Sequence, residues 1–176
     1  MADKTLDGLL DKFEKKAKSS GLDKGAAEKA EEAWVAKFED MKLKVLRPTL
    51  EMLGREVRKR EHDFNIVELP FKRFEMRPMP QESMIRIDIY LANERTKTVI
   101  NAERRPYLKF ESHHRSQMVQ VTICDITSRG GVESKIGDFT IDQIDAGFVK
   151  DKFVALFKRL LAQQPGTTSP GRKATR

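Results

Sequence analysis

The spacing of apolar residues changes near residue 62, and this change restricts the fold more than any other feature. Before it, apolar residues recur three and four positions apart, as on one face of a helix. From residue 64 to residue 141 they alternate with polar residues in short runs separated by Pro, Gly and Asn. We therefore predict an α+β protein with a helical arm over 1–62, a sheet and C-terminal helix over 63–164, and a disordered basic tail over 165–176.

The helical arm carries a seam of apolar residues. The seam consists of Trp34, Phe38, Met41, Val45, Leu50, Leu53 and Val57. Its position steps by one residue before Pro48, and proline lacks the N–H that a continuous helix uses. We predict a kink near Pro48, or one helix that ends there and another that begins. Two large aromatic side chains one turn apart must be covered, either by the chain's own sheet or by a second chain.

The alternating runs predict an antiparallel meander of four or five strands, because the connections are too short for crossover helices. Pro70 favours an edge position for the first strand, and the change of alternation near Val67 and Glu68 predicts a bulge or a bend. Gly130-Gly131 is typical of a hairpin turn. An apolar stripe over residues 148–161 predicts a C-terminal helix that packs on one face of the sheet.

Cys124 is the single cysteine, so an intrachain disulfide cannot form and a reducing compartment is favoured. No apolar run approaches the roughly 18–20 residues that span a bilayer, and the first residues lack a signal-peptide core. We expect a cytoplasmic protein without a membrane partner.

The net charge is +7, but residues 63–142 contain 12 basic and 12 acidic side chains, so the excess lies on the helices and the tail. One local cluster, consisting of Arg55, Arg58, Lys59 and Arg60, could contact phosphates together with the tail. On the predicted polar face of the sheet, Tyr90, Tyr107, Arg86 and Lys109 could stack on bases, but Asp88 and Glu111 share that face. Cross-strand charge pairs are the favoured interpretation.

No residue pattern predicts catalysis, a metal site, a cofactor or a small-molecule substrate. His62, His113 and His114 do not combine with Cys124 into a zinc-ligand spacing. Asp125 followed by Glu133 and Lys135 is loosely similar to the metal-dependent nuclease motif of restriction-type enzymes. The spacer is only a tight hairpin, so we interpret these three residues as solvated turn residues.

Two functions remain. The first is a non-enzymatic cytoplasmic interaction module that self-associates as a homodimer or larger homo-oligomer, or binds a protein partner, through the seam of the N-terminal helices. The alternative is a nucleic-acid-binding accessory protein that uses the basic cluster at 55–60 and the basic tail.

Overall fold

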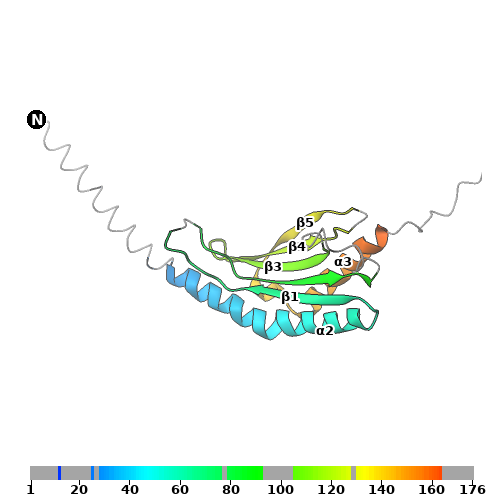
Figure 1. Ribbon diagram of the computed structural model, residues 1–176. Coiled ribbons are helices and arrows are strands. Elements are labelled where there is room, and N and C mark those ends of the chain that lie inside the picture. The colour runs from blue at the N-terminus through cyan, green and yellow to red at the C-terminus, as the bar shows by residue number, and fades with distance from the viewer. Residues whose placement is uncertain are drawn as a thin grey trace, which may run out of the picture.

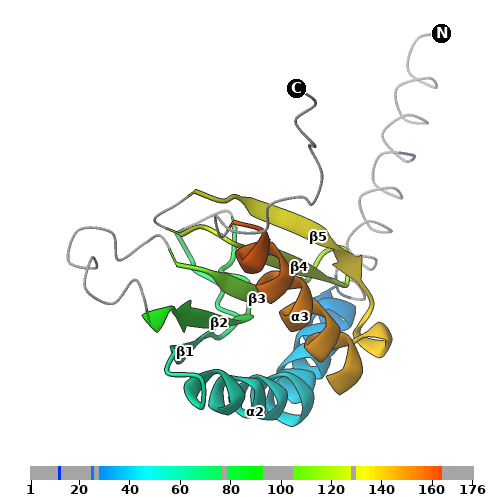
Figure 2. The same cartoon turned by 90° about the vertical axis from the view of Figure 1, so that its right-hand side faces the viewer.

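The computed structural model describes residues 12, 25, 28–76, 79–92, 105–127 and 130–163. An N-terminal helix, a five-stranded antiparallel sheet and a C-terminal helix follow one another along the chain (Figure 1). The sheet curves around α3 (Ala146–Ala162), while α2 (Arg47–Arg58) lies beside β1 (Asp63–Leu69) (Figure 2). This arrangement confirms the predicted α+β fold. The predicted tail over 165–176 lies outside the described residues.

The N-terminal helix changes its geometry just before Pro48. Residues 28–41 are helical, the π-helix η1 covers Lys42–Leu46, and α2 begins at Arg47. The backbone N–H of Arg47 donates to the carbonyl of Lys42, five residues earlier, so this turn holds one residue more than an α-helical turn. The extra residue explains the one-residue step of the seam. The irregularity that the sequence predicts near Pro48 is therefore a π-helical turn.

The sheet is a five-stranded meander. Its strands are β1, β2 (Met84–Tyr90), β3 (Tyr107–His113), β4 (Met118–Cys124) and β5 (Glu133–Phe139). Each strand is antiparallel to the next, and β1 and β5 form the two edges, which agrees with the position of Pro70 directly after β1. The register of β1 against β2 has no shift, so the bulge predicted near Val67 is wrong. The irregularity lies between Val121 and Thr122, where β4 pairs with β5.

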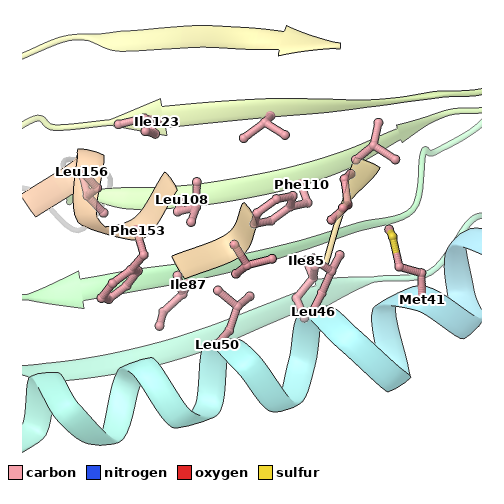
Figure 3. Close-up of a cluster of buried hydrophobic side chains, with 14 of the residues drawn as sticks. Met41, Leu46, Leu50, Ile85, Ile87, Leu108, Phe110, Ile123, Phe153 and Leu156 are labelled. Atoms are coloured by element: carbon pink, nitrogen blue, oxygen red, sulfur yellow. The ribbon is translucent and has the colours of Figure 1, made fainter. Parts of the chain in front are cut away.

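Both helices and the inner face of the sheet share one hydrophobic core. Leu46 and Leu50 of the N-terminal helix and Phe153 and Leu156 of α3 point toward the sheet in Figure 3. The inward side chains of β2, β3 and β4 are at most 1% exposed; they are Ile85, Ile87, Ile89, Leu108, Phe110, Val119, Val121 and Ile123. The predicted packing of the C-terminal helix on the sheet is confirmed, and the carboxylate of Asp145 caps that helix by accepting from the N–H of Phe148.

The seam of the helical arm is covered by the chain itself. Phe38 is fully buried, Trp34 is 7% exposed, and their rings stack with centroids 5.9 Å apart. Met41, Leu50 and Val57 are also buried, and Val45 and Leu53 pack against the core. Of the two alternatives for the seam, cover by the chain's own sheet is therefore the one that the structure shows, and the buried Trp34 and Phe38 need no second chain to cover them.

Candidate functional site

An open groove lies between α2 and the edge strand β1. It has a volume of roughly 450 Å³ and is lined by Glu51, Arg55 and Arg58 of α2 and by Phe64, Asn65 and Ile66 of β1. Its walls therefore combine two cations, one carboxylate, one amide and two apolar side chains. We call this feature the α2–β1 groove.

Close packing of Phe64 on Gly54 sets the distance between the helix and the strand. A Cβ atom at position 54 would lie 2.6 Å from Cγ of the Phe64 ring, so only glycine allows this approach. Arg58 also lies over the Phe64 ring, with its guanidinium carbon 4.8 Å from the ring centroid, and forms an ion pair of 2.7 Å with Asp63. Phe64 thus joins the helix and the strand at one end of the groove.

The four cations of the sequence-predicted cluster do not converge on one point. Arg58 pairs with Asp63, and Lys59 pairs with Glu56 at 2.7 Å. Among the described residues, Arg55 and Arg60 have no carboxylate within ion-pair distance. Of these two, only Arg55 lines the groove, where its Nε donates to the backbone carbonyl of Glu51. Arg55 is therefore the cation that remains available in the groove.

The carboxylate of Glu51 does not cancel the charge of Arg55, because it accepts from Nε of Arg47 at 3.1 Å. Arg47 reaches Glu68 as well, with 3.4 Å between Nη1 and Oε1. These two carboxylates raise the pKa of Arg47, the hydrogen bond from Glu51 being the largest cause. The three cations Arg47, Arg55 and Arg58 and the three carboxylates Glu51, Glu68 and Asp63 balance in number around the groove, and Arg55 supplies a local positive charge that suits an anionic group.

One edge of β1 offers backbone hydrogen-bonding groups to the groove. The N–H of Ile89 donates to Pro106, so Ile89 of β2 directs its backbone groups toward β3. In an antiparallel ladder the direction alternates, so Asp88 and Arg86 turn toward β1 and bond with Asn65 and Val67 opposite them.

The residues of β1 that alternate with Asn65 and Val67 must then direct their N–H and C=O groups away from the sheet. These residues are Phe64, Ile66 and Glu68. The N–H of Phe64 is taken by the carboxylate of Asp63 at 2.9 Å. Within the described ranges, no acceptor takes the N–H of Ile66 or of Glu68. The groove therefore borders a strand edge with unused donors and acceptors.

The outer face of the sheet, opposite the helices, carries paired charges. Nε of Arg86 lies 2.7 Å from Asp88, and Lys109 lies 2.8 Å from Glu111. The guanidinium of Arg86 covers the ring of Tyr107 at 4.8 Å, and that of Arg105 covers the ring of Tyr90 at 4.3 Å. The aromatic rings that could stack on bases are thus already stacked on arginines of the same chain.

Burial on this face raises the pKa of three titratable groups. It raises the pKa of the Asp88 carboxyl, and the neighbouring Arg86 opposes this rise. It also raises the pKa of the Cys124 thiol. The pKa of Tyr107 is raised by burial and by its hydrogen bond to Glu133. These shifts favour the neutral thiol and phenol, so neither group is activated as a nucleophile.

The structure also contains a buried polar cluster that the sequence analysis missed. Nζ of Lys42 donates to the hydroxyl of Ser83 at 3.1 Å and pairs with Glu39 at 2.6 Å, and Ser83 also donates to Glu39. Lys42 is 4% exposed and Ser83 is fully buried, so no substrate can reach this lysine–serine pair. The available signal was the place of Lys42, four residues after Phe38 on the seam face.

The same cluster continues to His114. Nδ1 of His114 lies 2.6 Å from Glu82, and Nε2 lies 3.9 Å from Glu31, which also pairs with Arg73. The hydroxyl of Ser112 donates to the second oxygen of Glu82. These bonds join the N-terminal helix to the loops at one end of the sheet, so we interpret the cluster as a structural connection.

Of the three residues compared with a nuclease motif, only Asp125 serves the β4–β5 turn, and it is 7% exposed, so its interpretation as a solvated turn residue is wrong. Glu133 and Lys135 belong to β5, and Glu133 hydrogen-bonds to Tyr107. The carboxylate of Asp125 accepts from the N–H of Val132 at 2.7 Å, and Lys135 pairs with Asp138. Gly130 and Gly131 have φ angles of 121° and 117°, as the predicted hairpin turn requires. Within the part of the chain that the structure describes, no three His, Cys, Asp or Glu side chains form a group that could hold a metal ion.

Comparisons with protein-family models, curated proteins and solved structures gave no match. No helix among the described residues has the length and apolar character needed to cross a membrane. Among the residues that the structure describes, the α2–β1 groove is the site best suited to a ligand.

Proposed function

We propose that the protein is a non-catalytic, cytoplasmic binding module that holds a segment of a protein partner in the α2–β1 groove. The observation that carries this proposal is the combination of an available cation, Arg55, with apolar side chains and an unused strand edge in one open groove. A phosphate or a small anion would use the cation alone. A polypeptide segment uses all three features.

An interaction module on the N-terminal helices was also the hypothesis from the sequence. The contact now proposed is the α2–β1 groove in place of the apolar seam. The seam residues lie in the core, whereas Glu51, Arg55 and Arg58 lie on the flank of α2 that borders the groove. The cytoplasmic location is supported by the single, buried Cys124. Self-association stays a prediction, and the seam gives no reason for it.

Nucleic-acid binding through Arg55, Arg58, Lys59 and Arg60 also stays a prediction. Its support is weaker, because Arg58 and Lys59 are paired with carboxylates and a phosphate would have to compete for them. The arginine-covered tyrosines of the outer face add no open stacking platform.

A random-peptide display library tests the proposed function. The purified protein is used as the target, and recovered peptides are measured against wild type, Arg55→Glu and the control Lys150→Glu. Lys150 is exposed on α3, outside the groove. We expect Arg55→Glu to weaken binding at least about tenfold, since a charge-assisted contact contributes about 1.5–3 kcal/mol, and Lys150→Glu to leave it unchanged.

The absence of any enriched peptide, or peptides that bind Arg55→Glu as well as wild type, would overturn the proposal. Binding of labelled single-stranded DNA or RNA at low salt, lost in Arg55→Glu and in Arg60→Glu, would instead support the nucleic-acid alternative. Circular dichroism of each variant shows whether the fold is kept.

A further inference from the structure

The geometry points to a mode of recognition for the groove, and this inference rests on the proposed function. We propose that the partner segment binds as an extended strand, antiparallel to β1, with an acidic side chain opposite Ile66. The protein would thereby gain a sixth strand at the β1 edge. Recognition would use backbone hydrogen bonds for affinity and Arg55 for the choice of side chain.

The first observation behind this inference is the direction of the β1 backbone. Ile66 directs both its N–H and its C=O outward, and Glu68 does the same at the next outward position. A neighbouring antiparallel strand exchanges two hydrogen bonds with each such residue. Ile66 and Glu68 are therefore a ready pairing site, and Phe64 contributes its carbonyl, because its N–H is already bonded to Asp63.

The second observation is the side of the sheet on which the groove opens. Ile66 lies opposite Ile87, a fully buried residue, so its side chain belongs to the inner face, where α2 lies. Cross-strand neighbours share a face. A residue of the added strand opposite Ile66 would therefore direct its side chain toward α2, and so would the residues two positions before and after it.

The third observation is the charge that these side chains would meet. On α2 the side chain opposite Ile66 would face Arg55, which has no carboxylate partner among the described residues, and Glu51, whose carboxylate is held by Arg47. A glutamate or aspartate opposite Ile66 would complement Arg55, whereas a lysine there would be repelled. Glu68 lies opposite the buried Ile85 and so shares this face, and a second carboxylate opposite it would be repelled. The intervening residues would lie beside Asn65 and Val67 on the outer face, where β-branched side chains suit an edge strand.

The open edge of β1 is short, and the residues at its two ends limit pairing with strands of other molecules. Pro70 directly follows β1, and Asp63 occupies the first outward N–H. Only about two residues of β1 remain available, so the contact is suited to a short linear segment. The edge strand of another sheet would have too few backbone groups of β1 with which to pair.

The test uses a blocked nine-residue peptide with glutamate at its centre, threonine at every second position from it and valine between them, titrated by calorimetry. In antiparallel addition the amide of the glutamate points at β1 and the valine amides point away. N-methylation of the central glutamate amide should therefore lower affinity at least about tenfold, since one or two hydrogen bonds are lost. N-methylation of an adjacent valine amide should change it little. Slippage by two residues preserves this parity.

The outcomes separate this inference from the proposed function. If both N-methyl peptides bind equally and binding still requires Arg55, the groove binds peptides but strand addition is overturned. If only valine methylation weakens binding, the antiparallel sense is overturned. A peptide with lysine in place of the central glutamate that binds as well as the glutamate peptide, or failure of the latter when library peptides bind, overturns the acidic specificity. If no peptide binds, the proposed function itself falls.

Discussion

Replacing Gly54 by alanine tests the packing that forms the groove. In an ordinary helix interior this change stabilises by about 0.8–1 kcal/mol, because glycine is the more flexible residue. Here the new methyl group would lie 2.6 Å from Cγ of the Phe64 ring, well inside van der Waals contact. Overpacking of this kind costs about 1–3 kcal/mol. We therefore expect Gly54→Ala to lower the unfolding free energy by about 0–2 kcal/mol, whereas the same change in an ordinary helix interior raises it.

A double-mutant cycle isolates this effect from helix propensity. In a Phe64→Ala background the collision is absent, so Gly54→Ala should stabilise by its full propensity of about 1 kcal/mol. Urea denaturation of the four proteins gives the coupling between positions 54 and 64, which we expect at about 1–3 kcal/mol. Equal effects of Gly54→Ala in both backgrounds, within about 0.5 kcal/mol, would show that α2 does not lie on Phe64.

Three further predictions concern the core and the outer face. Trp34→Ala should lower stability by about 3 kcal/mol or more, because a buried indole is lost, without changing the mass measured by light scattering; a change of mass would restore the seam as a contact. Cys124 should react with a disulfide reagent at least about a hundredfold faster in denaturing urea than in buffer, because burial shields the thiol and raises its pKa; similar rates would contradict its burial. Burial also raises the pKa of Asp88 in the folded state, so its ionisation opposes folding as pH rises through that pKa and the penalty disappears below it. Asp88→Asn should therefore be more stable relative to wild type at pH 7 than at pH 4 in urea titrations, and the reverse order would contradict the shift.

The order of the elements could be predicted because the helical and alternating periods are strong signals in this chain. The exact form of the irregularity before Pro48 could not, since a kink and a π-helical turn shift the seam in the same way. The cover of the seam depended on the curvature of the sheet around α3, a tertiary property with no local signal. Only the two-dimensional pairing of β1 and β2 shows which N–H groups point outward.

The candidate site was partly visible in the sequence. Arg55 belonged to a basic cluster, and Pro70 indicated an edge strand next to it in the fold. The sequence analysis did not identify the ion pairs that Arg58 forms with Asp63 and Lys59 forms with Glu56. The Lys59–Glu56 pair depends on rotamers along one helix face, and the Arg58–Asp63 pair depends on the turn between α2 and β1, so a count of charges along the sequence overstates how many remain available.

Residue-resolved amide hydrogen exchange of the free protein, followed by NMR, tests the strand edge without any ligand. Asn65 and Val67 donate to β2, whereas the N–H groups of Ile66 and Glu68 have no acceptor among the described residues. Slow exchange at 65 and 67 with fast exchange at 66 and 68 is the predicted result. Equal protection of all four amides, or the opposite alternation, would mean that β1 has no open edge for a partner to join.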